Sequence, residues 1–150
     1  MRGRSRILVV VAAALVAGCG GGGAKSPTGA GEAEAAVRAY LTALVEKDGA
    51  RACAKLTPQY QRSVVQQNPA IANQTKTTTC PKLLDAITRS ARFVSFEGQV
   101  LDDVSKVGKL GLKVTVRGTG ATVTGARGVQ RYELETRGGR WLIAKIERMG

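Results

Sequence analysis

The sequence predicts an α+β domain, because the spacing of its apolar residues changes about halfway along the chain. Before residue 92, apolar side chains recur every three or four positions, as on one face of a helix. After residue 92 they alternate with polar ones, as in a strand with one buried face. Roughly 120 residues follow the Gly-rich N-terminal segment, enough for one domain with one hydrophobic core.

Residues 32–49 form the first predicted helix. Glu32 and Glu34 suit the positive end of its dipole, and Gly49 is expected to end it. Its apolar residues make one stripe at helical spacing: Val37, Tyr40, Leu41, Leu44 and Val45.

Three more helices are expected in the first half. Residues 50–56 form a short helix that stops before Pro58, and Pro58 suits the first position of the next helix. Residues 66–79 are polar and irregular, so we expect a loop there. The last helix begins at Pro81.

The second half predicts strands. Residues 93–104 and 109–117 are the first two candidates, and residues 121–125 form a short continuation. Residues 129–137 alternate again, with charges of both signs on the outer face, and Gly138-Gly139 predicts a two-residue hairpin turn. The final strand is apolar on both faces from Trp141 to Ile146, which favours a central position in the sheet.

Residues 1–18 have the composition of a secretory signal: a basic start, an apolar run and small residues at the end. The apolar run, residues 7–17, would be about 17 Å long as a helix, against a hydrocarbon core of about 30 Å. A spanning helix is therefore disfavoured.

Two partial phosphate-loop motifs overlap the end of this segment. Gly18, Gly20 and Gly23 match G-x-G-x-x-G, and the run to Ser26 approaches G-x-x-x-x-G-K-S. No strand precedes this segment, its glycines disfavour a following helix, and Ala24 displaces the lysine. Nucleotide binding is excluded here, and we expect no cofactor.

The residues Val16-Ala17-Gly18-Cys19 resemble a bacterial lipobox. The resemblance implies diacylglyceryl transfer to the Cys19 thiol, cleavage between Gly18 and Cys19, and a lipid-anchored chain on the extracytoplasmic face of the cell membrane. Two or more acyl chains give stable anchoring. The alternative is an ordinary signal with an incidental cysteine. With a lipid on Cys19, residues 19–31 would be a flexible tether that reaches roughly 20 Å. The folded domain would then comprise residues 32–150.

The chain is strongly basic, with a net charge of +12, which falls to +9 once Arg2, Arg4 and Arg6 are removed with the signal. An anionic bilayer or envelope polymer would attract such a protein. Solubility near a membrane is the simpler explanation, because no compact Lys/Arg run exists. Export and an aromatic content of 4% disfavour nucleic acid as a partner.

Cys53 and Cys80 remain in the mature chain, and an even pair in an exported protein predicts a disulfide. The bond would stabilise the domain by roughly 3.5 kcal/mol in the chain-entropy model. The chain has no histidine, and the pair lacks the C-x-x-C spacing, so a metal or redox site is disfavoured.

The run AVRAYLTALVEKDGARACAKLTPQY, the helix end at Asp48-Gly49 and the closing GRWLIAKIE strand resemble an NTF2-like domain. The resemblance covers about residues 32–148. It implies N-terminal helices packed into a curved antiparallel sheet, which together form a cone.

The NTF2-like family includes ketosteroid-isomerase-like and polyketide-cyclase-like enzymes, which use a carboxylate base in an apolar cone. The acids here are expected at helix ends, turns and the charged sheet face, so no catalytic residue is carried over and we expect a non-enzymatic role. The cone would hold a small apolar or amphipathic ligand near Tyr40, Tyr132 and Trp141. The alternatives are an isomerase- or cyclase-like enzyme, and an interaction module whose basic surface meets an envelope protein or anionic polymer.

Overall fold

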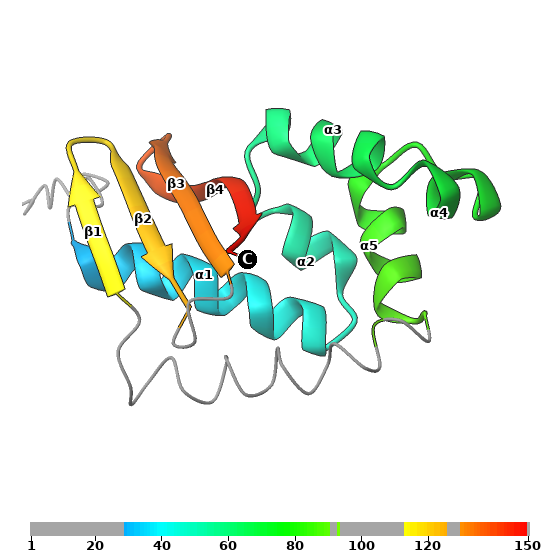
Figure 1. Ribbon diagram of the computed structural model, residues 1–150, viewed down its shortest axis with the longest axis horizontal. Helices are drawn as coiled ribbons and strands as arrows, with labels where there is room; N and C mark the ends of the chain where they lie inside the picture. Colours follow the sequence, from blue (N-terminus) through cyan, green and yellow to red (C-terminus); the bar gives the residue numbers. More distant parts are fainter. Residues whose placement is uncertain (1–28, 91–92, 94–112, 126–129, 150) are drawn as a thin grey trace, which may run out of the picture.

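The computed structural model describes residues 29–90, 93, 113–125 and 130–149, and in them helices precede strands along the chain (Figure 1). This order confirms the α+β class. The helices are Ala30–Val45 (α1), Gly49–Cys53 (α2), Pro58–Gln67 (α3), Pro69–Gln74 (α4) and Cys80–Thr88 (α5). The strands are Lys113–Arg117 (β1), Gly120–Thr124 (β2), Gln130–Arg137 (β3) and Arg140–Arg148 (β4).

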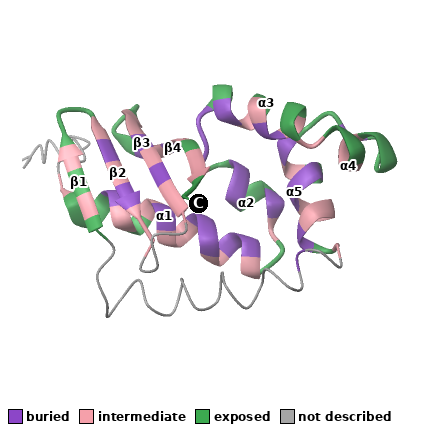
Figure 2. Cartoon of the chain, viewed as in Figure 1, coloured by how far each residue is buried: buried purple, intermediate pink, exposed green. Residues whose placement is uncertain are grey.

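The four strands form an antiparallel sheet in the order β1-β2-β3-β4. Helix α1 lies across one face of this sheet and contacts β1, β2 and β4 (Figure 1). Buried residues follow the inner side of α1 and continue into α2 and α5 (Figure 2). The predicted stripe is confirmed at Val37, Tyr40, Leu41 and Leu44, which are all buried.

Two tight turns set the register of the sheet. Gly138 and Gly139 have φ values of 55° and 72°, which confirms the predicted hairpin between β3 and β4. A two-residue turn with both φ values positive twists in the sense that antiparallel strands require. In the two-residue turn between β1 and β2, Gly118 takes the one positive φ, 59°.

The central position predicted for the last strand is wrong in the described sheet, where β4 lies at one end. Its outer edge meets residues 55–57 instead of another strand. The Ile143 N–H donates to the Lys55 carbonyl at 2.8 Å, and the Thr57 N–H donates to the Ile143 carbonyl at 2.9 Å. These bonds satisfy the outer-edge backbone of Ile143, and Trp141 and Ile143 are buried, which accounts for apolar residues on a strand at the end of the sheet.

Two boundaries also differ from the prediction. Residues 66–79 are not all loop, because Pro69 begins the short helix α4 and supplies the preset φ that a first turn needs. Helix α1 ends at Val45, and Lys47 takes the positive φ of 58° that follows the helix. Gly49 is the first residue of α2.

Helices α2 and α5 pack closely together. The structure places Cys53 and Cys80 at disulfide distance, with their Cα atoms 6.1 Å apart. The Gly49 N–H donates to Asp85 Oδ1 at 2.7 Å, so a carboxylate of α5 satisfies a free N–H at the start of α2. The predicted signal, the lipobox with Gly18 and Cys19, most of the tether and nearly all of the strand over 93–104 lie outside the described residues.

Candidate functional site

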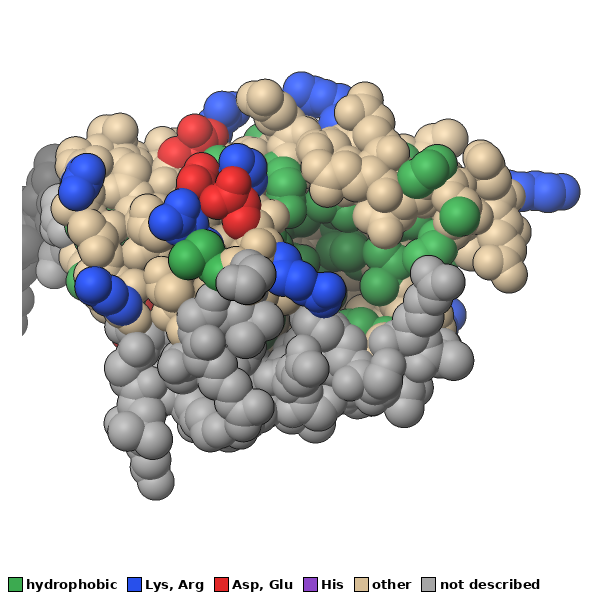
Figure 3. All heavy atoms as spheres, viewed as in Figure 1, with side chains coloured by type: hydrophobic (Ala, Val, Ile, Leu, Met, Phe, Trp, Pro, Cys, Tyr) green, Lys and Arg blue, Asp and Glu red, His purple; other side chains and the backbone are tan. Residues whose placement is uncertain are grey.

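An apolar cleft of about 300 Å³ opens between the helices and the ends of β3 and β4. In Figure 3 hydrophobic side chains line a hollow near the middle of the view. The described residues that line it come from α1, α3, α5, the two strands, and two positions just after α3 and α5: Tyr40, Leu41, Leu44, Tyr60, Val64, Gln67, Asn68, Leu84, Ile87, Phe93, Gln130, Ile146 and Arg148.

Local sequence determines how α3 presents its side chains to the cleft. Thr57 precedes the helix, and its buried hydroxyl Oγ1 accepts from the Tyr60 N–H at 3.1 Å. Pro58 follows at the first helical position. This cap fixes the start of α3, and helical spacing then puts Tyr60 and Val64 on the same inward face.

Two tyrosines provide the hydroxyl groups among the described residues that line the cleft. Tyr40 is 7% exposed and Tyr60 is 8% exposed. Burial raises the pKa of Tyr40, and the neighbouring Tyr60 raises it further. Burial also raises the pKa of Tyr60, although a hydrogen bond with the Ile146 backbone and the charge of Lys145 act in the opposite direction. Both phenols are therefore neutral at physiological pH.

Arg148 is the one charged residue among the described residues that line the cleft. It is exposed at the end of β4, and no described carboxylate forms an ion pair with it. Three amides also line the cleft, and two of them already donate locally: Gln67 Nε2 to Ser63 Oγ and Asn68 Nδ2 to the Val64 carbonyl, each at 2.8 Å. The cleft thus combines an apolar interior with a positive charge.

The three aromatic residues predicted to line a cone have different surroundings. Tyr40 lies in the cleft. Tyr132 is buried in the core on β3, and its hydroxyl hydrogen-bonds to the side chain of Gln130. Trp141 lines a separate depression of about 300 Å³ with Glu32 and residues of the β3–β4 turn. The structure therefore brings Tyr40 to the cleft without Tyr132 or Trp141.

Several cleft residues were not singled out from the sequence. Tyr60 and Leu84 had a signal, because each recurs with other apolar residues at helical spacing in the helices expected after Pro58 and from Pro81. Arg148 had no such signal, because it is one of 23 basic residues in the sequence. It lines the cleft because the end of β4 lies next to the helices. Phe93 was assigned to a strand, whereas its buried side chain lies in the cleft just beyond α5.

The described lining of the cleft consists of apolar side chains, two phenols, three amides and one guanidinium. No carboxylate occurs among its described lining residues. Across the described ranges, no group of three or more His, Cys, Asp or Glu side chains is arranged to hold a metal ion. A search of the same residues finds no helix with the length and apolar character needed to cross a membrane.

Comparison with known proteins finds no match: no family model, no curated protein and no solved structure is similar to this chain.

Proposed function

We propose that the protein is a lipid-anchored extracytoplasmic lipoprotein whose NTF2-like domain binds a small amphipathic ligand. The apolar cleft carries the proposal, because it joins a hydrophobic interior to Arg148 with no acid among its described lining residues. The packing of α1 across an antiparallel sheet agrees with the helix-on-sheet arrangement of an NTF2-like domain. The basic start, apolar run and lipobox of residues 1–19 support the anchor.

The size and lining of the cleft define the ligand class. Small-molecule pockets are usually about 300–1,000 Å³, so a cleft of about 300 Å³ suits a small molecule. Leu41, Leu44 and Leu84 offer an apolar surface to its body. Arg148 offers a positive charge to its head group. A medium-chain carboxylate has both properties.

Decanoate is the probe for the cleft, with binding measured by isothermal titration calorimetry. Ile87 is half-buried in the lining, so Ile87→Trp should fill the cleft and abolish measurable binding. Ile71→Trp is the matched control, because Ile71 is also half-buried but lies on α4 outside the lining. Equal losses in the two variants, or no decanoate binding by the parent protein, would refute a ligand cleft.

The charge at Arg148 has its own test. Arg148→Gln should weaken decanoate binding about two- to fivefold, the usual range for an exposed charge pair. Binding of decanol, which has no charge, should not change. An equal effect on both probes would show that Arg148 contributes contact area and not charge.

The anchor is tested on the full-length chain expressed in a bacterial host. Mass spectrometry of the membrane fraction should find the N-terminal peptide beginning at Cys19 with its lipid attached. Cys19→Ser should abolish both the modification and the cleavage after Gly18. An unmodified chain that begins elsewhere would contradict the anchor.

A further inference from the structure

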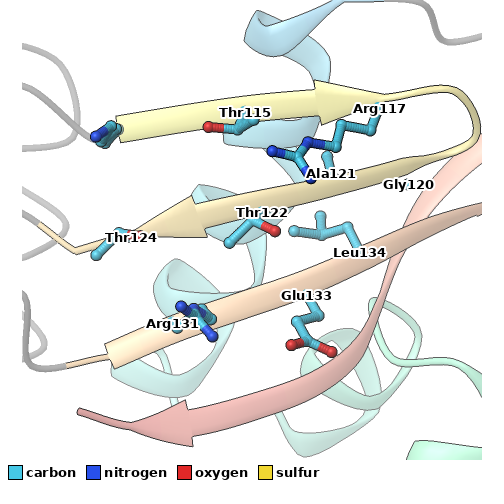
Figure 4. Close-up of a pocket in the computed structure, with 10 residues that line it drawn as sticks. Thr115, Arg117, Gly120, Ala121, Thr122, Thr124, Arg131, Glu133 and Leu134 are labelled. Carbon is cyan, nitrogen blue, oxygen red and sulfur yellow. The ribbon is translucent and has the colours of Figure 1, made fainter.

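A shallow depression of about 530 Å³ lies on the face of the sheet that is turned away from α1 (Figure 4). Three basic residues line it, Lys113, Arg117 and Arg131, together with the single acid Glu133 and three threonines. By strand alternation, Lys113 and Arg117 point outward on β1 while Val114 and Val116 pack against the core.

Ion pairs join several charges of β3 and β4. Arg131 Nη1 lies 3.5 Å from a carboxylate oxygen of Glu147, and Lys145 Nζ lies 2.5 Å from the other. Arg137 pairs with Glu135 at 2.5 Å. On this part of the outer face, opposite charges therefore form a solvated network of ion pairs.

The charges of β1 are not balanced in this way. Lys113 and Arg117 form no ion pair with any described residue, and β1 and β2 contain no acid. Strand β1 therefore carries two positive charges that no described carboxylate balances. The threonines at positions 115, 122 and 124 surround these cations with hydroxyl groups.

Strand β1, which carries these two cations, lies next to the start of the described domain. The N-terminal end of α1, which begins at Ala30, lies beside β1, and the two elements are in contact (Figure 1). A chain anchored at Cys19 has ten residues to reach Gly29, at most about 35 Å when fully extended. The tether therefore enters the domain next to the strand with the unbalanced cations.

We propose that Lys113 and Arg117 dock on the anionic phospholipid surface of the membrane that holds the anchor. The proposal rests on the anchoring part of the proposed function. Each cation near an anionic bilayer raises the partition coefficient about fivefold. The tether adds a high local concentration of head groups, so even modest affinity orients the domain.

Vesicle sedimentation tests this surface with a chain that begins at residue 20. This chain lacks the anchor but keeps the whole described core, which extends from Ala33 to Ile143. It should bind vesicles of phosphatidylcholine with phosphatidylglycerol, bind poorly to phosphatidylcholine alone, and dissociate as salt is added.

Two double variants distinguish an effect of this surface on lipid binding from an effect of the protein's net charge. Lys113→Gln with Arg117→Gln should lower the partition coefficient about 25-fold. Lys82→Gln with Arg89→Gln removes the same charge from exposed positions at the α5 end of the molecule and should have little effect. Circular dichroism checks that both variants fold.

Four results would overturn the docking surface. The first is no binding to phosphatidylglycerol vesicles, and the second is an equal loss in both double variants. The third is binding to soluble polyphosphate without binding to vesicles, which would favour an anionic polymer. The fourth is self-association of the Lys113 and Arg117 variant with unchanged lipid binding, since charges on an end strand also deter sheet pairing. None of these results depends on Cys19, so failure of the anchor is detected separately.

Discussion

Gly49 lies directly against α5, and we predict that Gly49→Ala destabilises the domain. A Cβ atom at this position would lie 2.2 Å from the Pro81 carbonyl oxygen, 2.6 Å from Asp85 Oδ1 and 2.9 Å from the Asp85 nitrogen. Two of these three atoms belong to the backbone of α5, so a side-chain rotation cannot relieve the contact. The two helices must move apart.

The structure gives the size of the effect. The closest contact must lengthen from 2.2 Å to at least 3.4 Å, and overpacking of this kind costs about 1–3 kcal/mol. The same movement breaks the 2.7 Å hydrogen bond from Gly49 to the Asp85 carboxylate, worth about 1.5–3 kcal/mol. The lower entropy of the unfolded Ala chain offsets about 0.4–1 kcal/mol. The free energy of unfolding should fall by about 2–5 kcal/mol.

Urea unfolding followed by the fluorescence of the single tryptophan, Trp141, measures this loss. Gly31→Ala is the matched control, because Gly31 lies in α1 and a Cβ there would meet nothing within 4 Å. The control should gain about 0.4–1 kcal/mol. If Gly49→Ala is as stable as the parent or gains as the control does, the close approach of α2 and α5 is wrong.

Three further predictions concern stability. Replacing Cys53 and Cys80 by serine should lower the free energy of unfolding by roughly 3.5 kcal/mol, and a reducing agent should destabilise the parent but not this variant. Thr57→Ala should cost about 1–2 kcal/mol in urea unfolding, because the Tyr60 N–H loses its partner, whereas Thr57→Ser should restore most of the loss. Burial raises the pKa of Tyr40 above its usual 10.0, so unfolding releases a proton at alkaline pH and stability should fall as the pH rises above 10. Tyr40→Phe should reduce this alkaline loss, and an unchanged pH profile would contradict the burial of the phenol.

The sequence determined much of the fold where the signal was local. The apolar stripe of α1, Pro58 at the start of α3 and the Gly138-Gly139 turn each depend on backbone preferences and spacing within a few residues. The boundary at Gly49 was wrong for the opposite reason. Glycine after a helical stripe usually ends the helix, but here it permits α5 to approach, and that neighbour is 36 residues away.

The candidate site shows the same division. Tyr40 was predicted from its aromatic character, and it lies in the cleft. Trp141 has equal aromatic character, yet it lies in a different depression, because the packing of β4 and α1 decides which end of the sheet it reaches. Arg148 lines the cleft because the tertiary structure places the end of β4 next to the helices.

The sequence by itself determined the α+β class and most of the elements. It also predicts an exported, anchored chain with one cysteine pair. These follow from composition and short-range periodicity. The tertiary structure decided that β4 lies at the end of the described sheet and that the described lining of the cleft is apolar with one cation. It also decided that the unbalanced charges lie on β1, a strand in contact with α1. The physical reason is that a surface or cleft is made by segments distant in sequence, and their meeting depends on packing that no local pattern records.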